Sequence, residues 1–255
     1  MKYIEYGADR AVTVILLHGG GLSWWNYRET AELLREEYRV ILPILDGHAG
    51  SDRPFTAIGD NAEELIAWID EKLGGRAALI GGLSLGAQIL LDMLSRRPAL
   101  CRCAVVESAS VLPSAWTHAL IAPTFGSSYG LIRNRRFAEL QARSLHIRPE
   151  LFEDYYHDTC RIEKADMIAF LQASTVYAAK DSLGACGAET RILVGEKENR
   201  AMRRSAELLH SRIPGSALTV LPGLHHGEFS LNHARDYAQL LRGCVRSAAE
   251  KGAEP

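Results

Sequence analysis

The sequence predicts an α/β fold in which a mostly parallel central sheet carries helices on both faces. Short apolar runs, several of them rich in Val and Ile, recur along the chain, and a strand that is covered on both faces needs such a run. Between the runs, apolar residues recur at the spacing i, i+3, i+4 and i+7, which gives a helix one buried face. Alternation of these two patterns is typical of a parallel sheet that is covered by helices.

The apolar runs give the expected order of strands along the chain. An edge strand is expected at residues 2–6, and buried strands at residues 11–17, 38–42, 77–80, 103–106, 191–194 and 217–221. Helical spacing is found at residues 62–69, 87–94 and 234–241. Asp60, followed by Glu63, predicts a capping box at the start of the first of these helices.

The alternation of strand and helix stops between residues 113 and 187. No convincing strand is found in this stretch, whereas apolar residues at 151–156 and 167–177 have helical spacing. We therefore expect residues 1–112 and 188–255 to form the α/β core, with residues 113–187 as an inserted helical subdomain. The many aromatic residues of the insertion either pack a core of its own or line a ligand pocket.

The composition is that of a globular protein whose partner is a small molecule. Apolar residues make up 47% of the 255 residues, enough for a large core. The 29 basic and 31 acidic side chains leave a net charge of −2, so neither nucleic acid nor an anionic membrane is an expected partner. The five scattered cysteines are expected to be free thiols. The first apolar run is too short to span a bilayer and no cleavage site follows it, so the cytoplasm is the expected compartment.

A pentapeptide with a central serine predicts a nucleophile. Gly82-Leu83-Ser84-Leu85-Gly86 follows an expected buried strand and opens an expected helix, so Ser84 is expected on the tight turn between them. Glycines flank the serine because such a turn leaves no room for bulk. The turn presents the hydroxyl at the carboxyl end of the sheet, where open α/β sheets bind ligands. The alternative is a glycine-rich turn that serves only helix–strand packing.

The segment His18-Gly19-Gly20-Gly21 directly follows the strand expected at residues 11–17. Such a loop lets backbone N–H groups point at one spot and stabilise the oxyanion that a serine nucleophile creates. Gly20 is the first choice of donor and Gly21 the second. The other donor is expected to be the N–H of Leu85, at the positive end of its helix. His18 is expected to brace the loop rather than to take part in catalysis.

Two adjacent histidines, His225 and His226, follow the last expected strand. An imidazole suits a general base because its pKa lies near neutral pH without tuning. We expect His226 to be the base, with His225 as the fallback. A zinc site made by these histidines with Glu228 or His233 is not expected, because no HExxH-like spacing occurs.

The third catalytic group must be an acid, at another strand end, that orients the imidazole. Glu198 lies just past the strand expected at 191–194, and Glu107 ends the strand expected at 103–106. We favour Glu198, with Glu107 as the alternative and Glu196 as a third candidate; a solvated loop carboxylate is the other interpretation of each. The chain order Ser84, Glu198, His226 is the nucleophile-acid-base order expected for successive strand ends of one sheet.

Together these residues resemble the α/β-hydrolase family over nearly the whole chain. The loop at His18 is similar to the family's oxyanion loop, Ser84 to its nucleophile elbow and His226 to its base loop. The segment Asp46-Gly47-His48-Ala49-Gly50-Ser51-Asp52 resembles the family's Asp-x-x-Gly-x-Gly-x-Ser-Asp segment, with Ala49 at a position where related chains often carry Gly. At the acid position Asp is usual, and the longer Glu198 keeps Glu107 as an alternative. The helices at 113–187 stand where the family places its cap.

The resemblance implies a serine hydrolase that cleaves a small carboxylic ester through an acyl-enzyme, with no cofactor and no metal. Trp24 and Trp25 follow the oxyanion loop and either line the substrate pocket, together with Gly21 and cap aromatics, or pack the helix. A serine at position 84 argues against the dehalogenase and epoxide hydrolase branches, which use a carboxylate nucleophile. The same triad also suits a C–C lyase or synthase like the menaquinone-pathway members, an amide or thioester hydrolase, or a ligand receptor.

Overall fold

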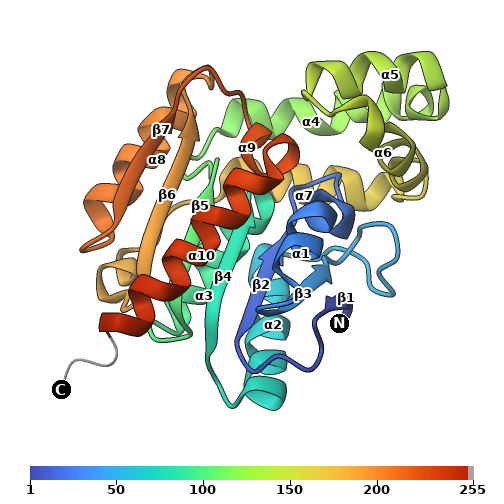
Figure 1. Cartoon of the computed structure of the whole chain (residues 1–255). Coiled ribbons are helices and arrows are strands. Elements are labelled where there is room, and N and C mark those ends of the chain that lie inside the picture. Colours follow the sequence, from blue (N-terminus) through green and yellow to red (C-terminus); the bar gives the residue numbers. More distant parts are fainter. Residues whose placement is uncertain (252–255) are drawn as a thin grey trace.

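The computed structural model describes residues 1–251, in which seven strands form one sheet in the order β1-β3-β2-β4-β5-β6-β7 (Figure 1). Strand β1 (Lys2–Tyr6) is antiparallel to β3 (Arg39–Ile44). The other neighbouring strands are parallel: β2 (Thr13–Leu17), β4 (Ala77–Leu83), β5 (Cys101–Glu107), β6 (Glu189–Gly195) and β7 (Ala217–Leu221). The α/β fold expected from the sequence is therefore confirmed.

The strands differ from the expected ranges only at their ends. Strand β2 begins at Thr13 because the two residues before it are exposed and lie outside the sheet. Strand β4 continues past Ile80, where two glycines interrupt the apolar run. Gly81 and Gly82 pair with Leu16 and Leu17 of β2, so the ladder continues where the hydrophobic pattern stops.

Helices cover both faces of the sheet. On one face lie α1 (Arg28–Leu34) and α10 (Ala234–Lys251), and on the other lie α2 (Ile58–Leu73), α3 (Leu85–Arg96) and α8 (Arg200–Arg212). Strand β2 contributes to both cores: Val14 and Leu16 pack with α1 and α10, whereas Ile15 and Leu17 pack with α2 and α3. Its continuous apolar run is therefore buried on both sides, as the sequence predicts.

The capping box predicted at Asp60 and Glu63 is wrong. Helix α2 begins at Ile58 after Ala57, whose extended backbone forms the N-terminal boundary without a side-chain cap. Asp60 consequently lies inside the first turn, where its carboxylate accepts a hydrogen bond from the hydroxyl of Thr56.

Between β5 and β6 the described chain is helical, and its helices α4 to α6 stand beyond one end of the sheet (Figure 1). The elements are α4 (Ala115–Ser128), α5 (Arg135–Ser144), α6 (Phe152–Thr159) and α7 (Lys164–Val176), with the 3-10 turns η2 (Tyr129–Arg133), η3 (Pro149–Leu151) and η4 (Asp181–Ala185). Turn η4 packs against α3 and its Leu183 is fully buried. No helix within residues 1–251 combines the length and apolarity needed to cross a membrane.

Candidate active site

Ser84 lies on the tight turn between β4 and α3, with the backbone angles φ 52° and ψ −111°. A non-glycine residue is strained there, and such strain persists only where the surroundings hold it. The N–H of Ser84 donates to the carbonyl oxygen of Glu107 at 2.9 Å, and its own carbonyl oxygen accepts from Gln88 at 2.9 Å. A Cβ on Gly86 would lie 2.3 Å from the carbonyl oxygen of Leu17. Glycine at position 86 is therefore required for α3 to pack against β2.

His226 and Glu198 are brought together from the ends of two neighbouring strands. Glu198 lies in the turn after β6, and His226 follows β7. The Nδ1 atom of His226 lies 2.8 Å from Oε2 of Glu198, whose other oxygen accepts hydrogen bonds from Ser108 Oγ (2.7 Å) and from the N–H of Gly195 (2.8 Å). Burial alone would raise the pKa of the Glu198 carboxyl, but the hydrogen bond and charge of His226 and the other donors outweigh it and lower the pKa.

An ionised Glu198 fixes the proton on the ring of His226. A carboxylate can only accept hydrogen bonds, so Nδ1 of His226 must be the donor in this pair. In the neutral imidazole the remaining nitrogen, Nε2, then has a free lone pair. Such a nitrogen can take a proton from a hydroxyl.

Ser84 and His226 line the same small cavity, which has a volume of about 70 Å³. Its other lining residues are mostly glycine and aliphatic: Gly19, Gly20, Leu22, Leu83, Leu145, Ile147, Gly227 and Leu231. No hydrogen bond joins Ser84 to His226 in the described part of the chain, and contacts of this kind commonly tighten only when substrate binds. Leu145 and Ile147 come from the helical segment between β5 and β6, which therefore covers the serine.

The loop after β2 distinguishes the two candidate oxyanion donors. The N–H of Gly21 donates to Nε2 of His48 at 3.0 Å and is therefore occupied. The N–H of Gly20 donates to no other described residue, and a Cβ at this glycine would lie 3.6 Å from the Cβ of Leu85. Leu85 is the first residue of α3, where backbone N–H groups have no partner within the helix. The backbone of Gly20 therefore lies close to Leu85, the residue that follows Ser84.

Two buried histidines hold this loop, one expected and one missed by the sequence analysis. His18 Nε2 accepts the N–H of Leu45 at 3.2 Å, and the ring packs edge-on against His48. Burial lowers the pKa of His48 to about 4 and that of His18 well below its ordinary value, so both rings are neutral and can accept these N–H groups. His18 thus braces the loop, as expected, and the 46–52 segment contributes a second brace.

Glu107, the alternative acid, is buried but does not contact His226. Its Oε1 atom accepts the N–H of Ser230 at 3.2 Å, and its Oε2 has no hydrogen-bond partner among the described residues. Burial raises the pKa of Glu107 to about 7. Glu196 is exposed and accepts the N–H of Gly223 at 2.7 Å. Of the three candidate acids, Glu198 alone is bonded to the imidazole of His226 in the described chain.

Of the two interpretations of Trp24 and Trp25, packing agrees with the structure better than a pocket wall, since neither they nor Gly21 line the cavity that contains Ser84. Both indoles belong to the 3-10 turn η1 (Trp24–Tyr27), which directs them elsewhere. Trp25 is 2% exposed and donates its Nε1–H to Asp158 of α6. Trp24 packs under the guanidinium of Arg28. Trp25 therefore joins the core to α6, whereas Trp24 packs against α1, and neither lines the cavity beside the serine.

Ser108 was not identified from the sequence, although its hydroxyl donates to Glu198. It directly follows Glu107 at the end of β5, and its backbone has φ 54°. The signal available in the sequence was its place at a strand end beside the candidate acid.

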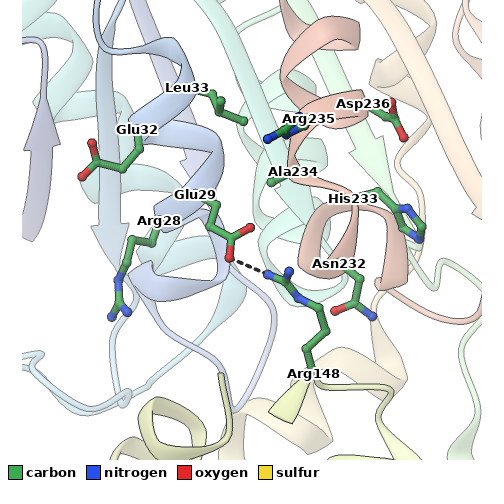
Figure 2. Close-up of a pocket in the computed structure, with 10 residues that line it drawn as sticks. All are labelled: Arg28, Glu29, Glu32, Leu33, Arg148, Asn232, His233, Ala234, Arg235 and Asp236. Carbon is green, nitrogen blue, oxygen red and sulfur yellow. Dashed lines mark hydrogen bonds and ion pairs between the residues drawn. The ribbon is translucent and has the colours of Figure 1, made fainter. Parts of the chain in front are cut away.

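A second, larger cavity of about 570 Å³ lies between α1 and the start of α10, and Figure 2 shows the charged side chains that line it, including Arg148 bonded to Glu29. None of the candidate catalytic residues lines this cavity.

Comparison with known proteins agrees with the observed fold. The model of the alpha/beta hydrolase family matches residues 14–240. A pimeloyl-[acyl-carrier protein] methyl ester esterase of Neisseria meningitidis serogroup B (strain MC58) is 26% identical over 249 residues, which cover 93% of this chain and 94% of that protein. Among solved structures, the enol-lactonase from Burkholderia xenovorans LB400 has a TM-score of 0.80 at 15% identity, covering 96% of each chain. An esterase from Thermogutta terrifontis has a TM-score of 0.79 at 20% identity, covering 97% of this chain and 93% of that one.

Proposed function

Because the chain belongs to the alpha/beta hydrolase family, we propose that it is a serine esterase that hydrolyses a small carboxylic ester through an acyl-enzyme. The observation that carries this proposal is the 2.8 Å contact between the buried Glu198 and Nδ1 of His226, beside a cavity that Ser84 shares. That contact leaves Nε2 of His226 as the proton acceptor. No cofactor or metal enters the proposed reaction.

Each proposed residue has one role in the reaction. His226 takes the proton of the Ser84 hydroxyl while the oxygen attacks the ester carbonyl, and the N–H groups of Gly20 and Leu85 stabilise the oxyanion. When the tetrahedral intermediate collapses, His226 returns the proton to the departing alcohol and the acyl group stays on Ser84. His226 then deprotonates a water molecule, which attacks the acyl-enzyme; when this second tetrahedral intermediate collapses, the bond to Ser84 breaks, His226 returns the proton to the Ser84 oxygen and the acid is released. Glu198 stabilises the imidazolium in both halves.

The cavity limits the group that lies next to the scissile bond. At about 70 Å³ with aliphatic walls, it suits a short apolar group such as the methyl of a methyl ester. The Neisseria relative, a methyl ester esterase by name, supports the same choice. We propose that residues 113–187 form a cap, since Leu145 and Ile147 from this segment close the cavity. The cytoplasmic location expected from the sequence stays a prediction.

A covalent probe and an ester panel test this proposal together. We expect a fluorophosphonate to label Ser84, as located by peptide mass spectrometry, and we expect turnover of methyl esters that decreases as the alcohol group is lengthened from methyl to butyl. Ser84→Ala should lose both the labelling and the turnover. Glu196→Gln serves as the matched control, because the carboxylate of Glu196 has a hydrogen bond only to the N–H of Gly223 among the described residues. Labelling without turnover of any ester would contradict the esterase and favour the C–C lyase or the receptor. Absence of labelling in folded protein would contradict the nucleophile.

A further inference from the structure

Three side chains that can bind metal ions meet beside the loop that carries His226. They are His146, which lies between α5 and η3, His225, and Glu228, the first residue of α9 (Glu228–Asn232). One potential ligand atom from each lies within 4.8 Å of the other two, and all three residues are half-buried. From the sequence, a zinc site with His225 and Glu228 is not expected, because HExxH-like spacing is missing and His146 is some 80 residues away in the chain.

The cluster is built by contacts that hold each side chain in place. The rings of His146 and His225 stack with their centroids 3.7 Å apart and their planes at 14°. Oε2 of Glu228 accepts the N–H of His225 at 2.8 Å, which leaves its other oxygen available. His146 has φ 55°, a strained conformation for a non-glycine residue, and its carbonyl oxygen accepts the side-chain N–H of Asn232 at 2.8 Å.

We propose that His146, His225 and Glu228 bind one divalent transition-metal ion, of which Zn²⁺ is the best match. Two imidazoles and one carboxylate form a common three-residue set for zinc, with water in the fourth position. In a tetrahedral site whose ligand atoms lie about 2.0–2.2 Å from zinc, neighbouring ligand atoms are about 3.3–3.6 Å apart. From the present separation of up to 4.8 Å, metal binding therefore needs a contraction of about 1 Å, together with a splaying of the two stacked rings so that both lone pairs point at the ion.

At this position, a bound ion would affect the structure around the cavity of Ser84. His146 lies between Leu145 and Ile147, which close the cavity of Ser84, whereas His225 precedes His226. A bound ion would tie the helical segment to the histidine loop. Because the ion binds the folded chain and joins two segments that are distant in sequence, it should raise the thermal stability of the protein. The proposed esterase activity is not needed for this inference or for its test.

The test uses the full chain without an affinity tag. Titration with Co²⁺ should give the visible absorption of a tetrahedral cobalt site with one ion per chain, and Zn²⁺ should displace the cobalt and remove that absorption. His146→Gln and His225→Gln should each weaken Zn²⁺ binding by at least about tenfold, the loss that changes around a metal site commonly cause. His233→Gln is the matched control, because it removes a histidine near the same loop from outside the cluster.

The variant Glu228→Gln distinguishes a loss of metal binding from a loss of folding. Glutamine retains an oxygen that can accept the N–H of His225, so circular dichroism and metal-free thermal unfolding should match the wild type while Zn²⁺ affinity falls. Zn²⁺ should raise the melting temperature of the wild type and of His233→Gln, but not that of His146→Gln. The inference is overturned if the wild type binds neither Co²⁺ nor Zn²⁺, or if His146→Gln binds Zn²⁺ as tightly as His233→Gln does.

Discussion

The substitution Glu198→Gln removes the charge of the proposed acid while nearly preserving its shape. In the present structure one oxygen of Glu198 accepts two donors, Ser108 Oγ and the N–H of Gly195, and the other accepts Nδ1–H of His226. A glutamine has a single carbonyl oxygen. That oxygen must stay with the two donors, because a side-chain NH₂ group there would face Ser108 and the N–H of Gly195.

The NH₂ group of the glutamine would therefore face His226. As a donor it would require Nδ1 to act as acceptor, so the ring proton would move to Nε2, the nitrogen that must accept the proton of Ser84. If the proton instead stays on Nδ1, as catalysis requires, the Nδ1–H of His226 and the NH₂ group of the glutamine face each other as two donors. The imidazolium also loses its buried counter-charge. We expect kcat to fall by about 10²–10⁴, which corresponds to about 3–5 kcal/mol of transition-state stabilisation.

The assay is hydrolysis of a methyl ester under saturating conditions, with the fluorophosphonate labelling rate of Ser84 as a second readout. The labelling rate should fall along with kcat, because both need His226 as base. Glu107→Gln is the matched control: Glu107 is also buried but contacts Ser230 instead of the imidazole, so the kcat of this variant should stay within about tenfold of the wild type. The reasoning is refuted if Glu198→Gln retains kcat within tenfold, or if Glu107→Gln is the more damaging change.

Three further predictions concern stability. Ser84→Gly should raise the free energy of unfolding by about 1 kcal/mol relative to Ser84→Ala, since glycine relieves the positive φ; equal urea midpoints would contradict this. Gly86→Ala should lower it by about 2 kcal/mol because its Cβ would meet the Leu17 carbonyl, whereas Gly243→Ala, in open space on α10, should not lower it. Burial raises the pKa of Glu107 from 4.5 to about 7, so the folded state holds this proton longer than the unfolded state, and its contribution makes stability fall as the pH rises from about 4.5 to 7. In Glu107→Gln, the free energy of unfolding measured in urea should therefore fall by about 3 kcal/mol less over this pH range than it does in the wild type. Parallel pH profiles for the variant and the wild type would contradict the burial argument.

The sequence predicts the fold well because the sheet is buried on both faces. A strand such as β2 has to be apolar at every position, and that pattern is visible without tertiary information. The ends of elements are less visible, because they depend on pairing and exposure. Gly81 belongs to β4 through its ladder with Leu16, and α2 begins at Ile58 without the capping box that Asp60 indicated.

Some residues of the candidate site can be identified from local sequence patterns, whereas others need the tertiary structure. Ser84 and His226 stand in local patterns, a glycine-flanked turn and a loop after a strand, so the sequence identifies them as candidates. Choosing between Glu198 and Glu107 needs the tertiary structure, since both follow strand ends and only their contacts differ. Choosing between the two interpretations of the η1 tryptophans also needs the tertiary structure, because nearness in sequence to the oxyanion loop does not determine the direction of their side chains.

Backbone strain occurs at three residues of the candidate active site and the proposed metal cluster, two of which the sequence does not reveal. Within residues 1–251, the non-glycine residues with positive φ are Ser84, Ser108 and His146. Such conformations cost about 1–3 kcal/mol each and persist where other contacts hold them. Ser108 binds the candidate acid Glu198, and His146 is held by Asn232 within the proposed metal cluster. Glycine would adopt the same backbone without strain but supplies neither a hydroxyl nor an imidazole, so the strain at all three positions is best explained by what their side chains do.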